Sequence, residues 1–580
     1  MESSPIDSER LMNSLTLVPE PGIDAEAEAG TDKAQAHAEP SSFYSASPLH
    51  MAALDELPEW AAFADAARQA PIQANGLRLI DAAGIQLDIS AQATSPALAA
   101  AAEALLIARD FDRLRDQMFS GGMANMTEER AAWHTSLRTP APGEEVALER
   151  QRLNEFVRTA DSERRWRNIV HIGIGGSDWG VRLAISAFGY AGTWRQVRFV
   201  ANIDGHAIES GLAGLDPHNT LIVLASKSFT TAETLQNGER AVEWLVASGV
   251  DHPYDQVVAI TARPEVARAW GVPESNTFAF WDWVGGRFSL WSAVSLTTAL
   301  AVSSDVVAGM QAGAAAMDKH FAETPFAQNA PIQLAMAGIV NRSVLEYGSL
   351  NIAPYDSRLA NLVPYIQQLE MESLGKSVDL AGNAVSVPTG PAVWGMPGTD
   401  AQHTFFQWLH QGSDGAPVDF IVCQQADHHW PEHHSSLLAN CLAQREALLT
   451  GKSYEDALQE CLAAGVPPDK AQWLAKHRVH PGGRPSNLIV LPRLSPYTLG
   501  ALLAMYEHKV FVQAVVWGIN AFDQWGVEFG KLLAKGMFNE MSQMCDETAT
   551  RPEHKHDAST VHWVRVFGKS LQPPREASEK

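Results

Sequence analysis

The sequence has few cysteines, and none of them forms a pair at metal-binding spacing. Four occur in 580 residues: Cys423, Cys441, Cys461 and Cys545. Because they are scattered and lack a CxxC pair, they exclude a disulfide scaffold and a zinc ribbon. Such sparse cysteines are typical of a reducing compartment.

Positive charge is also scarce, since 43 Lys and Arg stand against 67 Asp and Glu, for a net charge of −24. A chain this acidic is a poor partner for nucleic acid or an anionic membrane, where cations must neutralise phosphates. We find no basic leader with an apolar core and no membrane-spanning apolar run. The most apolar stretch, residues 289–317, is broken by Ser, Thr and Asp305 and predicts a buried helix pair. We therefore expect a cytoplasmic protein without a nucleic-acid or membrane partner.

The chain is too long for one hydrophobic core, so two domains are expected, and a third is conceivable. Residues 1–48 show no period and are expected to be disordered. Residues 49–138 have a helical pattern. Five apolar runs then alternate with helical stretches, which predicts a parallel, doubly wound sheet. These runs are NIVHIGI, VRFVAN, TLIVLAS, QVVAITA and NTFAFW, while FIVCQQ and SNLIVLP predict strands of a second sheet.

The first apolar run leads into GIGGSDWG, residues 173–180. This is not a dinucleotide-binding GxGxxG motif, because Asp178 stands where the third Gly belongs. Gly175 and Gly176 permit close backbone approach, and Ser177 offers a hydroxyl at a helix start, where free N–H groups bind anions. A tight turn with Ser177 as the N-cap explains the segment equally well. Both interpretations stay open on these residues alone.

The third run leads into SKSFTTAET, residues 226–234, which gathers hydroxyls and one Lys at a predicted helix start. The residues are Ser226, Lys227, Ser228, Thr230 and Thr231. Hydroxyls and backbone amides together bind a phosphate dianion without many cations. A capping box of Thr230 and Glu233 would explain only part of the set. Phosphate binding is the favoured interpretation.

Two further segments carry charged side chains that suit chemistry. Arg287 follows two glycines in WVGGRFSLWS, so its guanidinium can approach a ligand closely, although a surface ion pair is the commoner fate of a single Arg. Gln368 and Glu372, four apart in YIQQLEMESLGK, share one face of a predicted helix. A lone Glu on a helix is usually solvated, so the spacing alone leaves its role open.

Histidines and a lysine stand in three later segments. His403 lies at the start of an apolar helix in PGTDAQHTFFQWLHQG, where a single His is more often structural than catalytic. Gln524 and Lys531 lie two turns apart in FDQWGVEFGKLLAK, on a helix whose Lys could equally be solvated. Residues 426–438 hold four His in adjacent pairs interrupted by Pro431. This spacing predicts no metal site.

In this order, the segments together resemble the glucose-6-phosphate isomerase (phosphoglucose isomerase) family. The matching stretches are IGIGGSDWG, SKSFTTAET, VGGRFSLWS, QQLEMESLGK, GTDAQHTFFQWLHQG and YEHKVFVQAVVWGINAFDQWGVEFGK. The last is long enough to be nearly diagnostic, and the resemblance extends from about Asn125 to Lys535.

Three departures from the family pattern stand out. Ser228 replaces a frequent Thr and keeps the hydroxyl, and Leu374 replaces a common Asn in the MES-x-GK stretch. Residues 125–138 match only loosely, with Glu129 and Trp133 out of pattern. None of these changes falls on a proposed catalytic group.

The resemblance implies an α/β fold with two doubly wound, flavodoxin-like sugar-isomerase (SIS) domains and a helical C-terminal arm. The implied divisions are a disordered extension (1–48), a first part of the large domain (49–140), a small SIS domain with phosphate-binding loops (141–299), a second part of the large SIS domain (300–515) and a C-terminal helix and arm (516–580). It also implies a homodimer whose active sites borrow residues across the interface.

The implied reaction is the reversible conversion of glucose 6-phosphate to fructose 6-phosphate through a cis-enediol, in glycolysis and gluconeogenesis, without cofactor or metal. The resemblance assigns phosphate contacts to Ser177, Ser226, Lys227 (chiefly through its backbone), Ser228 and Thr231. It assigns the base to Glu372 with Gln368 beside it, ring opening to His403 and Lys531, and the charge of the intermediate to Arg287 and the Gly286 backbone. Gln524 joins the substrate shell.

The residue types suit this chemistry. One carboxylate can remove a proton next to a carbonyl and return it to the neighbouring carbon. A fixed guanidinium stabilises the developing oxyanion and, unlike Lys, keeps its charge. An acid–base pair that includes a His can open the sugar ring first.

Two alternatives remain at the level of sequence. A broader aldose–ketose isomerase would also accept mannose 6-phosphate, and pocket shape decides that. A non-catalytic sugar-phosphate-binding regulator on the same domain would keep the Ser/Thr loop but would not need Glu372, His403 and Lys531. Because all three are present, the sequence favours the enzyme.

Overall fold

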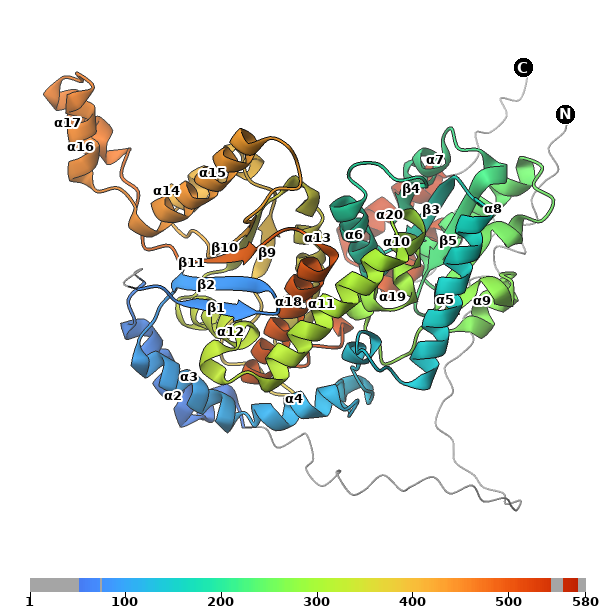
Figure 1. Ribbon diagram of the computed structural model, residues 1–580, viewed down its shortest axis with the longest axis horizontal. Coiled ribbons are helices and arrows are strands. Elements are labelled where there is room, and N and C mark those ends of the chain that lie inside the picture. Colours follow the sequence, from blue (N-terminus) through green and yellow to red (C-terminus); the bar gives the residue numbers. More distant parts are fainter. Residues whose placement is uncertain (1–51, 73–75, 544–555, 572–580) are drawn as a thin grey trace, which may run out of the picture. The chain divides into compact units, whose positions relative to one another are not determined.

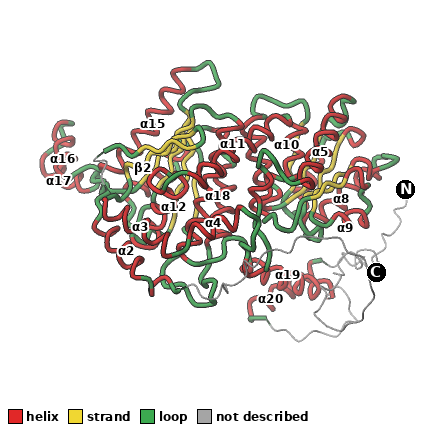
Figure 2. The backbone as a smooth tube through the Cα atoms, turned by 60° about the horizontal axis from the view of Figure 1, so that its bottom comes forward, coloured by secondary structure: helices red, strands yellow, loops and turns green. Residues whose placement is uncertain are grey.

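The computed structural model describes residues 52–72, 76–543 and 556–571, and it divides into two compact units, Met1–Ala521 and Phe522–Lys580. The segment expected to be disordered, 1–48, lies outside the described residues. The first unit holds two β-sheets, which Figure 2 shows as two separate groups of strands with helices around each. The expected α/β class is confirmed.

All strands of the five-stranded sheet run parallel. In spatial order they are β4 (Gln196–Val200), β3 (Asn168–Gly173), β5 (Thr220–Ala225), β6 (Val257–Thr261) and β7 (Thr277–Ala279). Each coincides with one of the five apolar runs, so those five strands are confirmed. Strands β3, β5 and β6 are buried along their whole length because helices cover both faces.

The six-stranded sheet is mixed, with four parallel strands and an antiparallel hairpin. In spatial order it contains β1 (Leu79–Ala82), β2 (Ile85–Ala91), β11 (Ser486–Leu491), β10 (Val418–Cys423), β8 (Ser349–Tyr355) and β9 (Ala392–Gly395). The two strands predicted for a second sheet, β10 and β11, are confirmed. They pair in parallel at the centre of this sheet (Figure 1).

Helices surround both sheets. Those between residues 144 and 301 are α5 (Glu144–Ser162), α6 (Trp179–Phe188), α7 (Gly205–Leu212), α8 (Ala232–Ala247), α9 (Pro264–Trp270) and α10 (Leu296–Ala301). The other helices of the first unit are α2 (Pro58–Gln69), α3 (Pro96–Ala108), α4 (Phe111–Phe119), α11 (Ser304–Glu323), α12 (Ala330–Ile339), α13 (Leu362–Leu374), α14 (Phe406–Gln411), α15 (Pro431–Thr450), α16 (Tyr454–Ala463), α17 (Pro468–Lys476) and α18 (Pro496–Trp517). The buried helix pair predicted near residues 289–317 is present as α10 and α11.

Helix α18 forms the centre of the core beside the six-stranded sheet and packs against α11, α12 and α13. Its start is fixed by a capping box between Ser495 and Thr498 with Pro496 at the first position, and it ends at Gly518 with a φ of 72°. Among the described residues it is the one helix long and apolar enough to cross a membrane by length and composition. Its most apolar window is 100% buried in the protein, which is the position of a core helix.

Two parts of the fold differ from the sequence prediction. Residues 49–138 were expected to be helical throughout, but Leu79–Ala91 form the β1–β2 hairpin, joined by Ala83 and Gly84 at positive φ. Strands β8 and β9 were not predicted, and in β8 the residues Asn351 and Pro354 interrupt the apolar pattern. These strands are nevertheless integrated in the sheet, since β2 pairs with β11, β8 pairs with β10 and β9 pairs with β8.

The second unit contains α19 (Trp525–Gln543) and α20 (Ala558–Ser570) within its described residues. Strands of the five-stranded sheet all come from residues 168–279, and strands of the six-stranded sheet come from residues 79–91 and 349–491. The finer division of the chain at residues 140, 299 and 515 stays a prediction.

Candidate active site

The loop after β3 combines a glycine-specific turn with a hydroxyl. Gly175 has a φ of 59°, and a Cβ atom there would lie 2.9 Å from Nε2 of Gln368. Helix α6 begins at Trp179 with Asp178 as its N-cap residue. The alternative interpretation of Ser177 as an N-cap is therefore wrong. Within the described residues the Ser177 hydroxyl makes no hydrogen bond, so it remains available to a ligand.

A buried histidine supports this loop from below. His171 on β3 is fully buried, and its Nε2 lies 2.8 Å from the carbonyl oxygen of Ser177 while its Nδ1 lies 2.9 Å from Oγ1 of Thr297. Burial lowers the pKa of His171 to about 4, despite the opposing effect of the Ser177 contact. The ring is therefore neutral at pH 7 and bridges the loop to the 3₁₀ and helical segment that begins near residue 293.

The loop after β5 lies beside the first because β3 and β5 are adjacent parallel strands, with Gly173 opposite Ala225. Oγ of Ser226 lies 2.9 Å from Oγ1 of Thr231, and the Thr230 hydroxyl donates to Oγ of Ser228 at 2.7 Å. Helix α8 begins at Ala232, and its N-cap Thr231 makes no side-chain capping bond. The proposed Thr230–Glu233 capping box is thus absent from this helix start. Its hydroxyls contact one another rather than capping the helix.

Lys227 directs its side chain away from this hydroxyl cluster. Its Nζ donates to the carbonyl oxygen of Asp282 at 2.7 Å, and its own carbonyl accepts from the Ala262 N–H at 2.9 Å. Burial and then the charge of Arg130 lower the pKa of Lys227 to about 8. The role of the Lys227 backbone in phosphate binding stays a prediction.

Helix α13 carries the candidate base. Gln368 and Glu372 lie one turn apart, and Nε2 of Gln368 donates to Oε2 of Glu372 at 3.1 Å. The expected shared face is confirmed, and the amide holds one carboxylate oxygen in place. The Glu372 side chain is 23% exposed, which leaves it partly open to a ligand.

Arg287 is buried rather than engaged in a surface ion pair, so that alternative is wrong. It lies on the 3₁₀ segment η9 (Gly286–Trp291), and its side chain is 2% exposed. Its Nε donates to Oγ of Ser373 at 2.6 Å, and its Nη2 donates to the carbonyl of Ala521. Its Nη1 lies 3.5 Å from Oε2 of Glu372. A fixed guanidinium thus faces the candidate base.

Close backbone contacts join these pieces. A Cβ atom at Gly176 would lie 1.9 Å from the carbonyl oxygen of Gly286, so the backbones of the β3 loop and η9 touch there. The Ser289 hydroxyl of η9 also donates to the Gly176 carbonyl at 3.2 Å. Nothing lies within 4 Å of the corresponding position at Gly286, which leaves that face open. The close contacts of Gly175 with Gln368 and of Gly176 with Gly286 therefore bring the β3 loop next to the segments that carry Glu372 and Arg287.

Comparisons with known proteins decide the family. A sequence profile described as phosphoglucose isomerase matches residues 88–564. The glucose-6-phosphate isomerase of Bordetella pertussis is 56% identical over 514 residues, covering 88% of this chain and 98% of the relative. That of Caulobacter vibrioides is 42% identical over 504 residues, covering 84% and 92%. The crystal structure of a glucose-6-phosphate isomerase from Chlamydia trachomatis superposes with a TM-score of 0.76 at 29% identity, covering 90% of this chain and 100% of that one.

The chain belongs to the phosphoglucose isomerase family. Its departures from the family pattern can now be placed in the structure. Leu374 is the last residue of α13 and is fully buried, two positions beyond Glu372. Ser228 is exposed, and its Oγ accepts a hydrogen bond from the Thr230 hydroxyl.

Three residues that the phosphoglucose isomerase resemblance assigns to the site are not brought to Glu372 within the first unit. His403 ends the 3₁₀ segment η14 (Asp400–His403), is exposed and makes no hydrogen bond within the described part of the chain. Gln524 and Lys531 belong to the second unit. Gln524 directly precedes α19, and Nζ of Lys531 lies 2.9 Å from Oε1 of Glu528 with a 68% exposed side chain. Their roles stay predictions.

Sequence reasoning missed the residues that hold Arg287 and Ser177. Ser373 and the Ala521 carbonyl fix the guanidinium, and His171 fixes the Ser177 carbonyl. The only local signal was a serine next to Glu372 and a histidine inside an apolar strand, both of which are common in protein cores. Long-range contacts of this kind leave no periodic trace in a sequence.

Among the described residues, neither a group of potential metal ligands nor one of the two cavities below suggests another site for this chemistry. In the described ranges no group of three or more His, Cys, Asp and Glu could hold a metal ion, and the four His of residues 426–438 do not form one. A cavity of about 20 Å³ lies beside Lys509 and Asn487, and one of about 90 Å³ lies beside Arg150 and Trp291. Neither is lined by a candidate site residue, so the side-chain geometry alone carries the assignment.

Proposed function

We propose that this chain interconverts glucose 6-phosphate and fructose 6-phosphate, with Glu372 as the base. It is an intramolecular oxidoreductase of the aldose–ketose isomerase class, and its substrate is a sugar phosphate. The observation that carries the residue assignment is the joint geometry of α13 and η9. Glu372 accepts from Gln368 on one side and faces Nη1 of the buried Arg287 on the other.

The proton-transfer step follows from this pair. The Glu372 carboxylate removes the proton on carbon 2 of the open-chain aldose, and the carbonyl oxygen on carbon 1 becomes negatively charged. The oxygen on carbon 1 then gains a proton and the hydroxyl on carbon 2 loses one, so that returning the carbon-bound proton to carbon 1 leaves the carbonyl on carbon 2 and produces the ketose. Arg287 is buried and held by two other contacts, so its charge is already in place when the oxyanion forms. The Gly286 backbone borders the same space.

The phosphate of the substrate binds at the two loops on the five-stranded sheet. Ser177 supplies a hydroxyl just before α6, Ser226, Ser228 and Thr231 supply hydroxyls just before α8, and Lys227 contributes through its backbone. Binding energy from the remote phosphate holds the reacting carbons over Glu372. The substrate arrives as a ring, which His403 and Lys531 open as an acid–base pair, with Gln524 lining the sugar.

A coupled assay tests this function directly. Purified protein receives fructose 6-phosphate without added metal, and formation of glucose 6-phosphate is followed through a coupling dehydrogenase, whose nicotinamide nucleotide is the hydride acceptor and serves the coupling enzyme only. Turnover that depends on Glu372 supports the function. Protein that is folded but gives no turnover in either direction contradicts it.

The functional unit in this proposal is a homodimer in which His403 serves the site of the second copy. His403 is exposed and makes no hydrogen bond among the described residues, and this supports a role in the site of a second copy. Unfolding and refolding together two inactive variants, Glu372→Gln and His403→Ala, tests it. In a two-fold symmetric dimer with shared sites, half of the dimers are mixed and each has one intact site, so about a quarter of wild-type activity returns. If each chain supplied its own His403, mixing would restore nothing.

The non-catalytic regulator finds no support in the comparisons, because the relatives are named as the isomerase over most of their length. A buried Arg aimed at a carboxylate also has no use in a protein that only binds a sugar phosphate. Acceptance of mannose 6-phosphate is a separate question, answered by assaying that substrate beside fructose 6-phosphate.

We further place the protein in the cytoplasm. Cys423, Cys441 and Cys461 are buried free thiols, and such thiols persist in a reducing compartment. Cell fractionation with a periplasmic marker enzyme tests this location, and co-fractionation with that marker would contradict it.

A further inference from the structure

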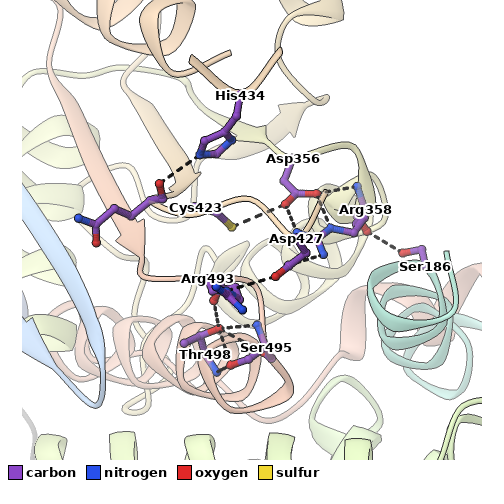
Figure 3. Close-up of polar contacts among 10 residues, drawn as sticks. Ser186, Asp356, Arg358, Cys423, Asp427, His434, Arg493, Ser495 and Thr498 are labelled. Carbon is purple, nitrogen blue, oxygen red and sulfur yellow. Dashed lines mark hydrogen bonds and ion pairs between the residues drawn. The ribbon is translucent and has the colours of Figure 1, made fainter. Parts of the chain in front are cut away.

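Four charged residues close the carboxyl edge of the six-stranded sheet (Figure 3). Asp356 follows the last residue of β8, Asp427 lies beyond β10, and Arg493 lies beyond β11. Arg358 stands between the two carboxylates, so that the charges alternate in the order Asp356, Arg358, Asp427 and Arg493. In open parallel sheets this edge usually receives ligands. Here ion pairs fill it.

Arg358 makes the densest contacts of this set. Its Nε and Nη2 donate to the two oxygens of Asp356 at 2.9 and 2.7 Å, and its Nη1 donates to Asp427 at 2.8 Å. Its backbone N–H also donates to Asp356 at 3.0 Å. Burial opposes the charge, but these hydrogen bonds raise the pKa of Arg358 above its ordinary value. The side chain therefore fixes its own backbone in the 3₁₀ segment η13 (Ser357–Leu359) to the ends of two strands.

The fixed backbone of Arg358 contacts the helix that follows the Ser177 loop. Oγ of Ser186, on α6, lies 3.0 Å from the carbonyl oxygen of Arg358, and the guanidinium lies 5.1 Å from the ring centroid of Tyr190 just past that helix. Figure 3 shows Ser186 reaching η13 from α6. This contact joins a helix of the five-stranded sheet to a segment of the six-stranded sheet.

Helices α6 and α13 pack together and are joined at both ends. At one end Gly175, three residues before Asp178 and α6, touches Gln368 on α13. At the other end Ser186, near the end of α6, touches Arg358, just before α13 begins. The helices therefore run in opposite directions, with the active site at the first end and the ion pairs at the second. Because a helix rises about 1.5 Å per residue, Arg358 lies on the order of 20 Å from Glu372.

We propose that Arg358 is a positioning residue for isomerisation: it holds α6 against α13 and so sets the Ser177 loop at the correct distance from Glu372. The inference rests on the proposed function, in which that loop binds phosphate and Glu372 transfers the proton. Binding of the phosphate depends on the loop hydroxyls alone. Proton transfer depends also on the distance between the Ser177 loop, which holds the substrate, and the Glu372 carboxylate. Misplacement of reacting groups by about 1 Å can reduce a rate 10²-fold.

The test compares Arg358→Met and Ser186→Ala with their double variant, and uses Arg493→Gln as a matched control. Arg493 belongs to the same ion-pair chain through Asp427 at 3.3 Å, but its side chain is 56% exposed. Its side chain also donates to Gln425 at 2.9 Å, and neither of these partners lies on α6. We expect Arg358→Met to lower kcat about 10- to 100-fold with KM changed less than about threefold. The double variant should lose no more kcat than Arg358→Met alone, because both changes disrupt the same contact between α6 and η13. Arg493→Gln should keep wild-type kcat.

Three results would overturn the proposal: wild-type kcat in folded Arg358→Met, an equal loss in Arg493→Gln, or additive losses in the double variant. If Arg358→Met does not fold, Arg358→Lys replaces it, since Lys keeps the charge but cannot make the paired contacts with Asp356. Amide hydrogen exchange gives a readout that needs no activity. Protection across residues 175–188 should fall in the Arg358 variant and not in Arg493→Gln, and equal protection in both would contradict the link. An inactive wild-type protein would refute the proposed function, while the exchange result would still decide this inference.

Discussion

At the carboxyl edge of the five-stranded sheet the chain turns through glycines and hydroxyls, whereas at the same edge of the six-stranded sheet it turns through paired charges. The first edge leaves the Ser177 hydroxyl without a partner among the described residues and groups Ser226 with Thr231 at 2.9 Å. The second satisfies Arg358 with Asp356 and Asp427. Topology makes both edges candidate ligand sites. Their side chains assign binding to one edge and mechanical support to the other.

Helix α13 links the two regions: it begins near the ion pairs of Arg358 and ends near the loop that carries Ser177. Glu372 lies on the last turn of this helix, so the base comes from one sheet's side and the phosphate loops come from the other's. This division of labour predicts that loss of Glu372 on α13 abolishes proton transfer, whereas loss of the loop hydroxyls mainly weakens substrate binding.

The largest expected effect comes from Glu372→Gln. The change keeps size and hydrogen bonding but removes the base, so kcat should fall at least ~10²–10⁴-fold with KM largely preserved. Glu370→Gln on the same helix is the matched control. Glu370 is fully buried and paired with Lys509, so its loss should lower the melting temperature, with a free energy of unfolding reduced by about 3–5 kcal/mol, while kcat survives. Wild-type-like turnover in Glu372→Gln would show that Glu372 is not the base.

The next effect concerns the loop after β5. The double change Ser226→Ala with Thr231→Ala should raise KM for fructose 6-phosphate by one to several orders of magnitude, at about 1.5–3 kcal/mol per charge-assisted hydrogen bond. Stability should fall by only about 1 kcal/mol, the usual net contribution of one hydrogen bond such as the one between Ser226 and Thr231. Steady-state kinetics and thermal unfolding on one preparation measure both quantities.

Ser453→Ala provides the opposite case, because Ser453 is a true N-cap whose Oγ accepts from the Asp456 N–H at 3.0 Å. That variant should lose about 1 kcal/mol of stability without any change in KM. An unaltered KM in the Ser226 and Thr231 variant, together with a lower melting temperature, would show that these hydroxyls stabilise the turn and do not bind the phosphate.

A smaller effect should appear in acid, from the histidine beneath the Ser177 loop. The pKa of His171 is about 4 in the folded protein and 6.5 in an unfolded chain. The unfolded state therefore binds the proton first, and stability that is complete above pH 6.5 is lost as the pH falls toward 4. The full loss is on the order of 3 kcal/mol. His171→Gln keeps an N–H donor for Ser177 and removes the titration, so its unfolding midpoint should depend less on pH between 6.5 and 4. Equal pH slopes for wild type and variant would exclude His171 as the cause.

No effect is expected from metal removal. A chelator should leave turnover within about twofold, because each proposed role belongs to an organic side chain. The His pairs of residues 426–438 lie just beyond β10, at the ion-pair edge. Activity that is lost to the chelator and restored by a divalent ion would contradict this expectation. It would mean that the carboxyl edge of the six-stranded sheet can have a role in the chemistry and not only in support.

Local patterns in the sequence were sufficient where a structure is locally determined. The strands of the five-stranded sheet are uninterrupted apolar runs, and the Gln368–Glu372 pair follows from one turn of one helix. Strand β8 escaped prediction because Asn351 and Pro354 look like loop residues, although Asn351 is fully buried and pairs through its N–H with the Pro417 carbonyl at 2.9 Å. The surrounding sheet overrides the local preference of these residues.

The supporting contacts of the site could not be predicted, because they join residues far apart in the chain. Ser373 and Arg287 are separated by 86 positions and Ser186 and Arg358 by 172. No periodicity or motif encodes such a pair. The glycines of IGIGGS were expected to let the backbone approach a ligand. The structure adds a second reason, since Gly176 must also admit the backbone of Gly286.

Hydrogen exchange at carbon 2 of the substrate tests the central claim most directly. Glucose 6-phosphate is incubated in deuterated water with wild-type protein, Glu372→Gln, or the Ser226→Ala, Thr231→Ala variant at saturating substrate, and the carbon-2 hydrogen is followed by proton NMR. The account predicts that the wild type and the loop variant lose this signal to solvent deuterium, while Glu372→Gln leaves it intact. Exchange at the wild-type rate in Glu372→Gln would show that another group moves the proton and would contradict the account.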